Sequence, residues 1–426
     1  MIKKTDYKVA VIGLGYVGLP LYLLCEKNKI NVKGFDINKF KINNLKRNIS
    51  DNTDISSADL KRAKKNFFSM HQIKSIKDRN FIIFCLPTPL TKKNYPDLSY
   101  IMNALKIMKN FCSSQSTFVL ESTVYPGATN EIFSKYLSNL NNDQKILNYG
   151  FSSERIDPGK KKNKFLKITY EDIPKVISGN NKSSQKEIKF FYGLLFKSVF
   201  VASSIEVAEM SKLLENSYRS VNIGLINEIK MLCHRGNINF HDVISAASSK
   251  PFGFNRFAPG PGVGGHCIPI DPIFLNWYAN KIKGKVDLIT IARKKNLDVT
   301  KFVNKNILKL LKKINSKKEK KILIIGVAYK RDINDYRESP SLKIINSFIK
   351  KKIKFDYYDP YIDSIKLFNK KIKSIKNLNR ISSYDIVTLV TDHTNLPYKK
   401  ILSKSKILID TRGYYAKYKN KNIIFL

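Results

Sequence analysis

Acidic residues and cysteines are scarce in this chain of 426 residues. The five cysteines are an odd number and include no CxxC pair, which argues against a disulfide-stapled secreted fold and against a zinc site. Only 34 Asp and Glu stand against 77 Lys and Arg, so the formal net charge is +43. Hydrophobic residues make up 43% and charged residues 26% of the chain, a balance typical of globular proteins. The composition therefore predicts a folded protein without a metal site and argues against disorder.

The positive charge could attract nucleic acid, anionic lipid or phosphorylated small molecules. However, the basic residues are dispersed, and Asn and Ile are over-used with Lys along the whole chain, as AT-rich coding would produce. No zinc-finger spacing, RNP-like segment or basic arm accompanies them. We therefore expect no nucleic-acid partner, and we expect the positive surface to help collect anionic substrates.

No long apolar segment is present near the start of the chain. Residues 9–25 form an uncharged stretch of 17 residues, shorter than the roughly 20 that span a bilayer, and they include three glycines and a proline. Residues 1–8 show no targeting pattern and lead directly into an apolar strand. We expect a cytoplasmic protein with no membrane segment.

Short β-branched apolar runs alternate with helical patterns, which predicts doubly wound parallel sheets. Residues 204–236 contain no proline and predict one long helix, suited to a spine between domains or to a dimer interface. Ser339-Pro340 predicts the start of a later helix. The predicted strands are 8–13, 31–36, 81–86 and 117–121, and then 322–326, 355–358, 385–390 and 407–410. The expected fold is α/β, with two Rossmann-like domains (1–200 and 311–426) joined by a long central helix and a helical middle domain (201–310).

A glycine motif follows the first predicted strand. Gly13, Gly15 and Gly18 form GxGxxG before a helix, and Asp36 ends the next strand. These glycines allow a tight turn and close approach of a pyrophosphate to a helix N-terminus. The Asp36 carboxylate would accept from a ribose 2′-hydroxyl and repel a 2′-phosphate, which favours NAD over NADP. The alternative is a tight turn with no ligand.

The segment around Cys267 carries the most chemical information. Asp271-Pro272 predicts a helix start, which places Cys267 just before a helix N-terminus that favours its thiolate. Several glycines nearby would allow close approach of a ligand (Gly260, Gly262, Gly264 and Gly265). We therefore interpret Cys267 as a nucleophile, the alternative being a core cysteine, and we expect the other four cysteines in the core. His266 is left open between a catalytic and a structural role.

Further polar positions share a helix face or a sheet edge. Glu209, Lys212 and Asn216 lie on one face of the long helix, as a solvated face or as a buried polar cluster. Residues 87–89, 121–127 and 153–159 each follow an apolar segment and are predicted at the carboxyl edge of the first sheet, where such folds bind ligands. Each alone is compatible with an ordinary turn.

Taken together, these motifs resemble the nucleotide-sugar dehydrogenases, the family of UDP-glucose and UDP-N-acetylhexosamine 6-dehydrogenases. The resemblance covers nearly the whole chain, and its most specific parts are the Cys267 segment and the Lys212/Asn216 pair. It implies an NAD-binding N-terminal domain, a central helix that builds a homodimer, and a C-terminal domain that holds UDP. It also implies a four-electron oxidation of a sugar C6 alcohol to the carboxylate, using two NAD⁺ and one water, through a thiohemiacetal and a thioester on Cys267.

The resemblance also implies roles for individual residues. Lys212 would stabilise the oxyanion or assist deprotonation of the alcohol, and Asn216 would donate to the same oxygen. Asp271 and Thr123 would act on the hydrolytic water or its proton, and Glu154 would lie near the thioester and the sugar. The implied catalytic residues are Cys267, Lys212, Asn216, Asp271, Thr123 and Glu154. The implied cofactor residues are Gly13, Gly15, Tyr16, Val17, Gly18, Asp36, Lys41, Thr88, Thr123 and Arg337. The implied substrate residues are Glu154, Arg155, Lys212, Asn216, Arg256, Phe257, Gly260, Gly264 and Lys330.

Substrate choice depends on departures from the family pattern. UDP-glucose enzymes typically carry a second glutamate four residues after the one matching Glu154, where this chain has Pro158. Residues 250–267 are most similar to UDP-N-acetylglucosamine 6-dehydrogenases, so we expect UDP-GlcNAc as substrate, in surface polysaccharide or O-antigen synthesis. UDP-GalNAc, UDP-ManNAc and UDP-glucose stay open as alternatives. More distant alternatives are a two-electron hydroxyacid-type dehydrogenase, a basic anion- or nucleic-acid-binding protein, and an inactive relative.

Overall fold

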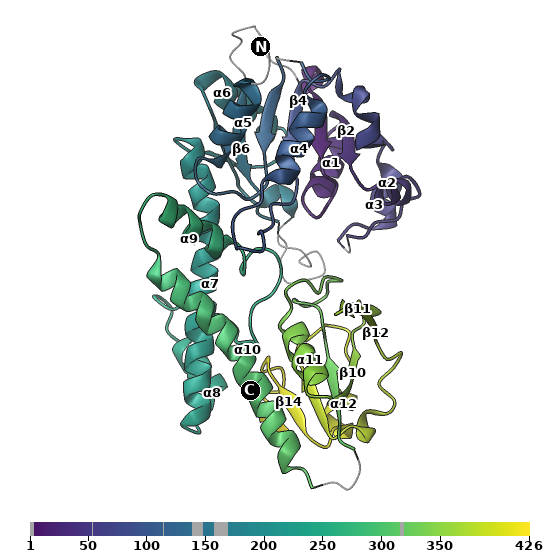
Figure 1. Ribbon diagram of the computed structural model, residues 1–426, viewed down its shortest axis with the longest axis vertical. Coiled ribbons are helices and arrows are strands. Elements are labelled where there is room, and N and C mark those ends of the chain that lie inside the picture. The colour runs from purple at the N-terminus through teal and green to yellow at the C-terminus, as the bar shows by residue number, and fades with distance from the viewer. Residues whose placement is uncertain (1–3, 53, 114, 139–147, 157–168, 316–318) are drawn as a thin grey trace. The chain divides into compact units, whose positions relative to one another are not determined.

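The computed structural model describes residues 4–52, 54–113, 115–138, 148–156, 169–315 and 319–426. The chain divides into two compact units. Unit 1 comprises Met1–Glu215 with Ile273–Gly284, and unit 2 comprises Asn216–Pro272 with Lys285–Leu426. Each unit contains its own twisted sheet with helices on both faces (Figure 1).

In the described part of unit 1, eight strands form one sheet in the order β3-β2-β1-β4-β5-β6-β7-β8. Neighbouring strands are parallel except for the antiparallel pair β6–β7. The strands are β1 (Lys8–Ile12), β2 (Asn31–Asp36), β3 (Phe67–Ser69), β4 (Phe81–Phe84), β5 (Thr117–Leu120), β6 (Tyr149–Ser153), β7 (Lys175–Gly179) and β8 (Val199–Val201). β4 and β5 are buried throughout and β1 is buried from its second residue on, as expected for strands covered on both faces.

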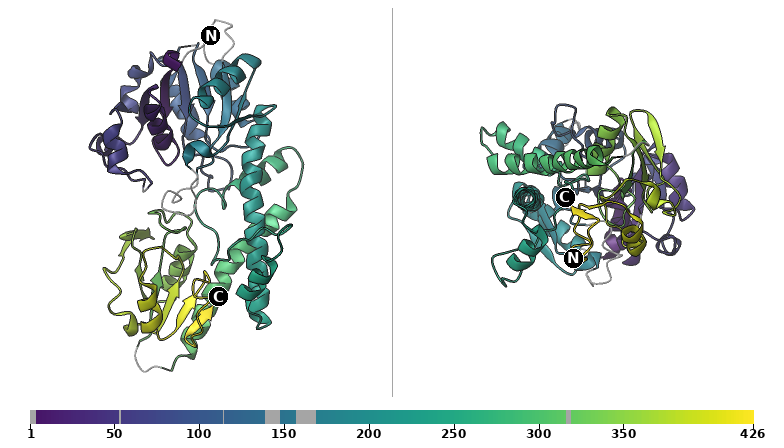
Figure 2. Two further views of the ribbon diagram at one scale, coloured as in Figure 1. Left: turned by 180° about the vertical axis from the view of Figure 1, so that it is seen from behind. Right: turned by 90° about the horizontal axis from the view of Figure 1, so that it is seen from below.

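Alternate residues of these strands face two helical layers. Phe81, Ile83 and Val119 pack in one core with side chains of α1 (Gly18–Lys27) and α6 (Lys182–Gly193). Phe84 and Phe118 contact Phe133 of α5 (Ala128–Ser138) on the opposite face. Figure 2 shows the sheet and its helices from two further sides. Unit 1 also contains the helices α2 (Lys39–Lys46), α3 (Ser57–Arg62) and α4 (Ser99–Met108), with short 3₁₀ helices at Lys4–Asp6, Met70–Ile76 and Tyr170–Asp172.

The sheet of unit 2 has the strand order β10-β9-β13-β14-β15, all parallel, among the residues described. Ile322 and Ile324 pack toward α10 and α11, whereas Leu323 and Ile325 pack toward α12. The strands are β9 (Lys321–Ile325), β10 (Lys354–Tyr358), β13 (Ile386–Leu389), β14 (Leu408–Asp410) and β15 (Ile423–Phe425), with a separate hairpin of β11 (Ser364–Leu367) and β12 (Lys370–Lys373). The helices are α8 (Phe240–Ala247), α10 (Asp287–Lys313), α11 (Pro340–Lys350) and α12 (Tyr398–Lys404), with a 3₁₀ helix at Ile381–Ser383.

Two helices cross the boundary between the units in sequence: α7 (Ile205–Arg235) and α9 (Asp271–Lys281). Within unit 2, α7 packs closely on α10. A Cβ at Gly224 would lie 2.9 Å from the Ala292 carbonyl oxygen, so only glycine allows this approach. The Asn227 side-chain amide donates to Asn296 Oδ1 at 3.0 Å beside this crossing. The single internal glycine of the long helix thus has a packing role.

The α/β fold class, the long helix and the predicted strands are confirmed, with strand ends one or two residues shorter in several cases. Ser339 caps α11 and Pro340 is its first residue, as predicted. The antiparallel β6–β7 pair and the short strands β3, β8 and β15 were not predicted, because three apolar residues give too little periodicity to distinguish a strand. Among the described residues, no helix is long and apolar enough to cross a bilayer.

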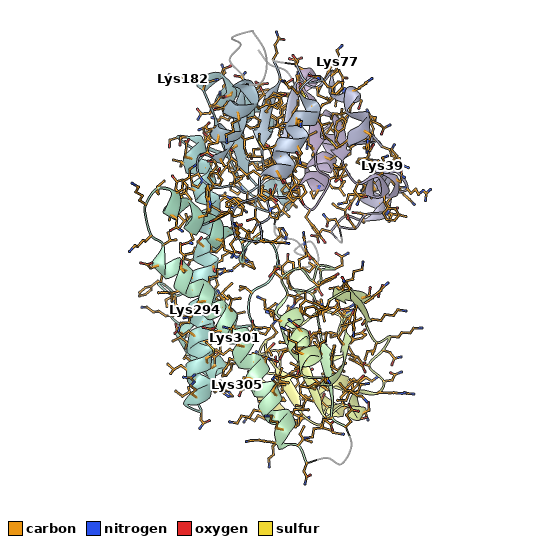
Figure 3. All side chains as sticks on the ribbon, in the orientation of Figure 1. Lys39, Lys77, Lys182, Lys294, Lys301 and Lys305 are labelled. Carbon is orange, nitrogen blue, oxygen red and sulfur yellow. The ribbon has the colours of Figure 1, made fainter. Side chains whose placement is uncertain are left out.

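The basic residues are distributed as the sequence indicates. Lysines project from many different elements (Figure 3), and those labelled there are all exposed: Lys39, Lys77, Lys182, Lys294, Lys301 and Lys305. They belong to α2, the segment after the second 3₁₀ helix, α6 and α10. The charge is therefore spread over these elements rather than concentrated on one of them.

Candidate active site

The glycine turn after β1 has the geometry of a dinucleotide site. Gly13 has a φ of 93°, and a Cβ there would lie 2.5 Å from the Cys85 carbonyl oxygen. A Cβ at Gly18 would lie 1.9 Å from the Gly13 carbonyl oxygen. A Cβ at Gly15, by contrast, would meet no atom within 4 Å, so the backbone is open at that position. The turn is therefore closed toward the sheet and accessible at Gly15, as close approach of a pyrophosphate requires.

Asp36 lies at the end of β2 beside this turn. Its Oδ2 accepts from the Leu14 backbone N–H at 2.9 Å, and its Oδ1 accepts from the Asn38 N–H at 2.9 Å. The side chain is half-buried, so each oxygen has capacity for a second donor such as a ribose hydroxyl. These residues fit a dinucleotide, with the carboxylate placed to discriminate against a 2′-phosphate.

The remaining predicted cofactor residues of unit 1 lie on neighbouring segments. Tyr16 and Val17 are half-buried, and α1 begins after them, at Gly18. Lys41 forms an ion pair with Asp51 at 3.1 Å. Thr88 Oγ1 donates to the Thr123 carbonyl oxygen at 2.7 Å, which joins the segments that follow β4 and β5. The structure thus brings Thr88 and Thr123 together at the carboxyl edge of the sheet.

Glu154 follows β6 at the same edge and is buried. Its carboxylate accepts from Lys175 Nζ at 3.0 Å and from the Tyr170 hydroxyl at 2.8 Å. Although burial alone would raise the pKa of Glu154, Lys175 lowers it below its ordinary value. Arg155 points to other partners, donating to the Pro174 carbonyl at 3.0 Å and pairing with Glu215. Pro158 and the rest of the 157–159 turn lie outside the described residues.

The polar face of α7 is a partly buried cluster rather than a solvated face. Glu209 is fully buried and accepts from the backbone N–H groups of Gly127 (2.5 Å) and Thr129 (2.8 Å) at the start of α5. Burial raises the pKa of Glu209 to about 7. The Lys212 ammonium donates to the backbone carbonyl of Glu154. One turn of α7 thereby holds both the α5 N-terminus and the segment after β6.

Unit 2 contains the Cys267 turn. The Cys267 carbonyl oxygen accepts from the N–H groups of Ile270 (2.9 Å) and Asp271 (2.8 Å), so the chain turns directly into α9, which begins at Asp271. Cys267 is half-buried. Asp271 is buried, and its Oδ2 accepts from the Asn216 side-chain amide at 2.6 Å. The structure thus joins three of the predicted catalytic residues through backbone and side-chain contacts.

The five cysteines, all within the described residues, form no disulfide with one another. Cys25 and Cys233 are buried, as expected for core cysteines. Cys85 and Cys112 are half-buried, so both are less buried than expected for core residues. Cys85 nevertheless packs against the hydrophobic core of unit 1.

The glycines near Cys267 accommodate protein atoms. A Cβ at Gly264 would lie 2.7 Å from the Tyr329 Cβ, and one at Gly265 would lie 2.7 Å from the Tyr329 ring. A Cβ at Gly260 would lie 2.8 Å from the Arg412 guanidinium. These glycines are therefore required by the close packing of Tyr329 and Arg412, a role that the interpretation of the sequence did not include.

The other predicted residues of unit 2 are spread over several segments. The Arg337 guanidinium is exposed and held by Asp335, with Nη2–Oδ2 at 2.6 Å, and lies 3.4 Å from His266 Nδ1. Arg256 is exposed, and Phe257 packs its ring against Tyr218 with centroids 6.0 Å apart. The Gly260 N–H donates to Asn227 Oδ1 at 3.2 Å.

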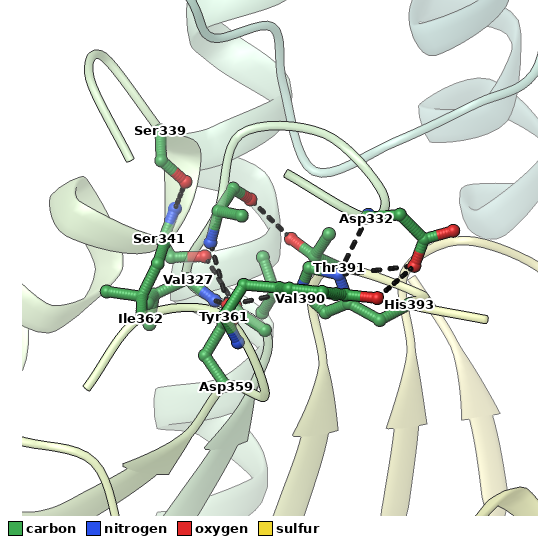
Figure 4. A network of polar contacts seen from close by, with 12 residues as sticks. Val327, Asp332, Ser339, Ser341, Asp359, Tyr361, Ile362, Val390, Thr391 and His393 are labelled. Carbon is green, nitrogen blue, oxygen red and sulfur yellow. Dashed lines mark hydrogen bonds and ion pairs between the residues drawn. The ribbon is translucent and has the colours of Figure 1, made fainter. Parts of the chain in front are cut away.

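Lys330 lies in the loop after β9, which a buried network holds in place (Figure 4). Asp359 Oδ2 accepts from the N–H groups of Val327 (2.7 Å) and Ala328 (3.0 Å) and lies 3.1 Å from His393 Nε2. The Asp332 N–H donates to His393 Nδ1 at 3.0 Å, so the proton of the neutral imidazole is on Nε2. Both ends of the segment bearing Lys330 are thus fixed by side chains from other strands.

Sequence reasoning missed Lys175, Tyr170 and Tyr192, and it named Glu121 only as part of a turn. A lysine at the first position of an apolar strand was the available signal, but such a residue is usually a solvated strand end. Only the fold shows that Lys175 is buried between two carboxylates.

Comparison with known proteins agrees with this geometry. Residues 7–195, 206–298 and 323–417 match the NAD binding, central and UDP binding domains of the UDP-glucose/GDP-mannose dehydrogenase family. The chain belongs to this family. It is therefore a nucleotide-sugar dehydrogenase, and its cofactor is NAD.

Named relatives span the whole chain. The UDP-N-acetyl-D-glucosamine 6-dehydrogenase of Salmonella typhi is 31% identical, over 99% of this chain and 95% of the relative. The UDP-N-acetyl-D-mannosamine dehydrogenase of Methanococcus maripaludis is 32% identical, over 97% and 95%. Among solved structures, UDP-D-ManNAc dehydrogenase from Pyrococcus horikoshii is 28% identical with a TM-score of 0.84, covering 98% of both chains.

Proposed function

We propose that this nucleotide-sugar dehydrogenase oxidises the C6 alcohol of UDP-GlcNAc to the carboxylate, in a four-electron reaction that consumes two NAD⁺ and one water. The contact that carries the proposal is the hydrogen bond from Asn216 to Asp271, whose own N–H donates to the Cys267 carbonyl. A buried carboxylate and amide next to a half-buried thiol form the set that covalent capture and hydrolysis of an acyl group require. A dehydrogenase that stops after one oxidation has no need of the thiol.

In this proposal Cys267 holds the half-oxidised carbon. The Gly13–Gly18 turn and Asp36 would hold NAD, which would supply the hydride acceptor for each oxidation. The Cys267 thiolate adds to the C6 aldehyde and forms a thiohemiacetal, whose oxidation leaves a thioester. Water then adds to the thioester carbonyl, with Asp271 as the base, and the thiol leaves as the carboxylate forms. The aldehyde is thus retained on the enzyme between the two oxidations.

Lys212 and Asn216 are proposed to stabilise the oxygen that becomes negatively charged. An ammonium and an amide N–H are suitable donors to an alkoxide or a tetrahedral oxyanion. Lys212 already donates to the Glu154 carbonyl, which limits its rotamers, and one of the two amide hydrogens of Asn216 is used by Asp271. Thr123 is assigned to the hydrolytic water, and Glu154 is assigned to the thioester and the sugar. Arg337, with Thr88, Lys41, Tyr16 and Val17, is assigned to the cofactor.

The UDP and the sugar of the substrate are assigned to further residues. The proposed set is Arg155, Arg256, Phe257, Gly260, Gly264 and Lys330. Three functional parts follow: residues 1–200 for NAD, 201–310 for catalysis and dimerisation, and 311–426 for UDP. The relatives named above act on GlcNAc and on ManNAc derivatives, so UDP-ManNAc is the second candidate. The two sugars differ at C2, away from the reacting C6.

We further propose a homodimer through α7, serving the synthesis of a surface polysaccharide such as O-antigen. Exposed apolar residues recur along this helix at seven-residue spacing: Val207 and Leu214 in unit 1, and Tyr218, Leu225 and Leu232 in unit 2. Such a spacing places each set on one helix face. The double variant Leu225→Glu/Leu232→Glu should be monomeric by light scattering, and a dimer of unchanged mass would contradict this interface.

The main test measures NADH formed per sugar with UDP-GlcNAc, UDP-ManNAc, UDP-GalNAc and UDP-glucose. We expect two NADH per UDP-GlcNAc and the highest kcat/KM with that substrate. Cys267→Ser should abolish acid formation, because serine oxygen lacks the thiolate's reactivity near neutral pH. Cys112→Ser is the matched control, since it removes a half-buried thiol outside the proposed site. Full acid production by Cys267→Ser would refute the covalent mechanism, and higher kcat/KM with another UDP-hexose would reassign the substrate.

A further inference from the structure

A buried lysine lies between two carboxylates at the carboxyl edge of the first sheet. Lys175 Nζ is 3.0 Å from Glu154 Oε2 and 3.2 Å from Glu121 Oε1. The Lys175 side chain is 2% exposed and that of Glu121 is 0% exposed. Glu121 directly follows β5, Glu154 directly follows β6, and Lys175 begins β7, so three neighbouring strands supply the group.

The two carboxylates have unequal surroundings. Glu154 accepts from Lys175, from the Tyr170 hydroxyl, and from the N–H groups of Arg155 (2.6 Å) and Ile156 (2.5 Å). Glu121 accepts from Lys175 and from the Tyr192 hydroxyl, both at Oε1. Among the described residues, no donor reaches Glu121 Oε2, which is buried. Glu154 is therefore equipped to stay ionised, whereas Glu121 has an oxygen on which a proton can reside.

The charge of the cluster points to the same assignment. Two carboxylates and one ammonium leave one uncompensated negative charge in the interior, which is costly. The other side chains facing the two carboxylates and Lys175 add no positive charge: Tyr170, Tyr192, the Cys85 and Cys25 thiols, and the ring of Phe196. The Lys212 ammonium contacts the backbone carbonyl of residue 154 rather than a carboxylate. Burial raises the pKa of Glu121 to about 7, whereas Lys175 lowers the pKa of Glu154 against the effect of burial. One proton bound to Glu121 neutralises the cluster.

Glu154 is also the link to Lys212. The Lys212 ammonium donates to the backbone carbonyl of residue 154, while the carboxylate of the same residue is held by Lys175. Displacement of the residue 154 backbone would therefore change the position of the Lys212 ammonium, and the contacts of the Glu154 side chain hold that backbone in place. The contacts form one continuous path from Tyr192 through Glu121, Lys175 and Glu154 to Lys212.

We propose that Lys175 is a positioning residue, which holds Glu154 as an anion and thereby fixes Lys212, while Glu121 holds the one proton that the buried cluster needs. The effect on catalysis rests on the proposed function, because Lys212 and Glu154 are assigned to the reaction there. The protonation of Glu121 does not depend on that assignment. A purely structural lysine would contribute to folding but would not couple the rate of the reaction to the titration of Glu121.

The first experiment follows the carboxyl groups of the substrate-free protein by infrared difference spectroscopy during a pH titration. Because Glu209 is a second buried carboxyl group whose pKa burial raises to about 7, the titration is run in the Glu209→Gln variant, which should still show one buried carboxyl group that loses its proton near pH 7. That band should be absent from the same variant with Glu121→Gln added, in which the amide preserves the shape and removes the titrating group. An unchanged band after Glu121→Gln is added would overturn the proton assignment, whether or not the protein is an active dehydrogenase.

The second experiment measures kcat and kcat/KM for NADH formation from UDP-GlcNAc as a function of pH. Lys175→Met, which retains the length but not the charge, should lower kcat by roughly a hundredfold, as misplacement of a catalytic group can. Lys175→Arg should recover part of that loss, and Lys182→Met, at an exposed position on α6, should behave as wild type. The pH profile of the wild-type kcat should show an inflection near pH 7, and this inflection should be absent from Glu121→Gln. A wild-type rate and profile in Lys175→Met would overturn the positioning role.

If Lys175→Met does not fold, Tyr170→Phe removes one donor to Glu154 without removing a charge, and it should lower kcat and leave the infrared band of Glu121 in place. A wild-type kcat in Tyr170→Phe would then count against the positioning path. If the wild-type protein forms no NADH from any UDP-hexose, the proposed function fails, while the infrared titration still decides where the proton resides.

Discussion

The two sheets begin with the same turn. Gly13, with φ 93°, directly follows β1, and Gly326, with φ 86°, directly follows β9. In each case the segment after a neighbouring strand leaves no room for a side chain: a Cβ would lie 2.5 Å from the Cys85 carbonyl oxygen, after β4, in unit 1 and 2.5 Å from Thr391, after β13, in unit 2. In each case, too, an aspartate at the end of the second strand accepts from the backbone that follows the glycine, Asp36 in unit 1 and Asp359 in unit 2.

The two aspartates differ in what else they bind. Asp36 is half-buried and accepts from two backbone N–H groups. Asp359 is buried, accepts from the backbone of Val327, Ala328 and Tyr361, and also contacts His393. Its acceptor capacity is therefore used inside the domain, whereas Asp36 can still accept from a ribose.

The segments after the glycines differ as well. In unit 1, α1 begins at Gly18, so its N-terminal N–H groups lie close to the turn. In unit 2, α11 begins only at Pro340, and the intervening loop carries Lys330. A glycine turn with a following aspartate thus occurs in both the region that matches the NAD binding domain and the region that matches the UDP binding domain. The short connection to a helix and an aspartate with remaining acceptor capacity distinguish the first domain from the second.

The largest change in the free energy of unfolding should come from removing Asp359, whose carboxylate accepts from several donors inside unit 2. Asp359→Ala would leave His393 and three backbone donors without their acceptor, at a cost of about 3–5 kcal/mol in the free energy of unfolding. Asp363→Ala, at an exposed position a few residues later, should change it by less than about 0.5 kcal/mol. Urea denaturation measures both. A loss for Asp359→Ala as small as that of Asp363→Ala would mean that the network does not stabilise unit 2.

The contributions of Glu209, in unit 1, and of Asp359, in unit 2, to the free energy of unfolding should depend on pH in opposite directions. Because burial raises the pKa of Glu209 from 4.5 to about 7, the folded state keeps this proton after the unfolded state has lost it. The stability of the wild type relative to Glu209→Gln should therefore fall by roughly 3 kcal/mol from pH 4.5 to 7 and stay level above it.

Asp359 should show the reverse trend. Burial opposes its ionisation, but the hydrogen bond with His393 lowers its pKa below the ordinary value. Its contribution is therefore present above the pKa of the unfolded state and is lost as the pH falls through the folded value. Urea denaturation of the wild type and of Asp359→Ala, from neutral pH to below the ordinary aspartate pKa of 3.8, tests the sign. Parallel pH trends for the Glu209 and Asp359 pairs of proteins would contradict the distinction.

The smallest of these effects concerns Asp36 and the cofactor. Asp36→Ala removes an acceptor for the ribose, and NAD affinity should fall roughly tenfold to a hundredfold, as loss of a hydrogen bond to a charged group implies. Discrimination against NADP should fall as well, because the carboxylate that repels its phosphate is gone. Calorimetric titration with NAD, NADP and UDP measures this, and UDP binding should be unchanged. Unaltered NAD affinity would show that Asp36 serves only the turn.

Much of the fold was predictable because its signals are local. The strand at 31–36 and the cap at Ser339-Pro340 were predicted to the residue, since periodicity and capping depend on near neighbours in sequence. The short strands and the reversal at β6–β7 were missed, because their stability comes from pairing with distant strands. For the same reason the packing role of the glycines at 264 and 265 was missed, because Tyr329, which lies beside them, is distant in sequence.

The sequence by itself determined the family pattern, the glycine turn with its aspartate, and the cysteine before a helix, because each is a spacing along the chain. The tertiary structure alone decided which polar groups are buried together. Glu121, Glu154 and Lys175 are separated by 21 or more residues in sequence, and only the strand order brings their charges within hydrogen-bonding distance. The proton held by such a cluster depends on distances and burial, and neither is encoded in local spacing.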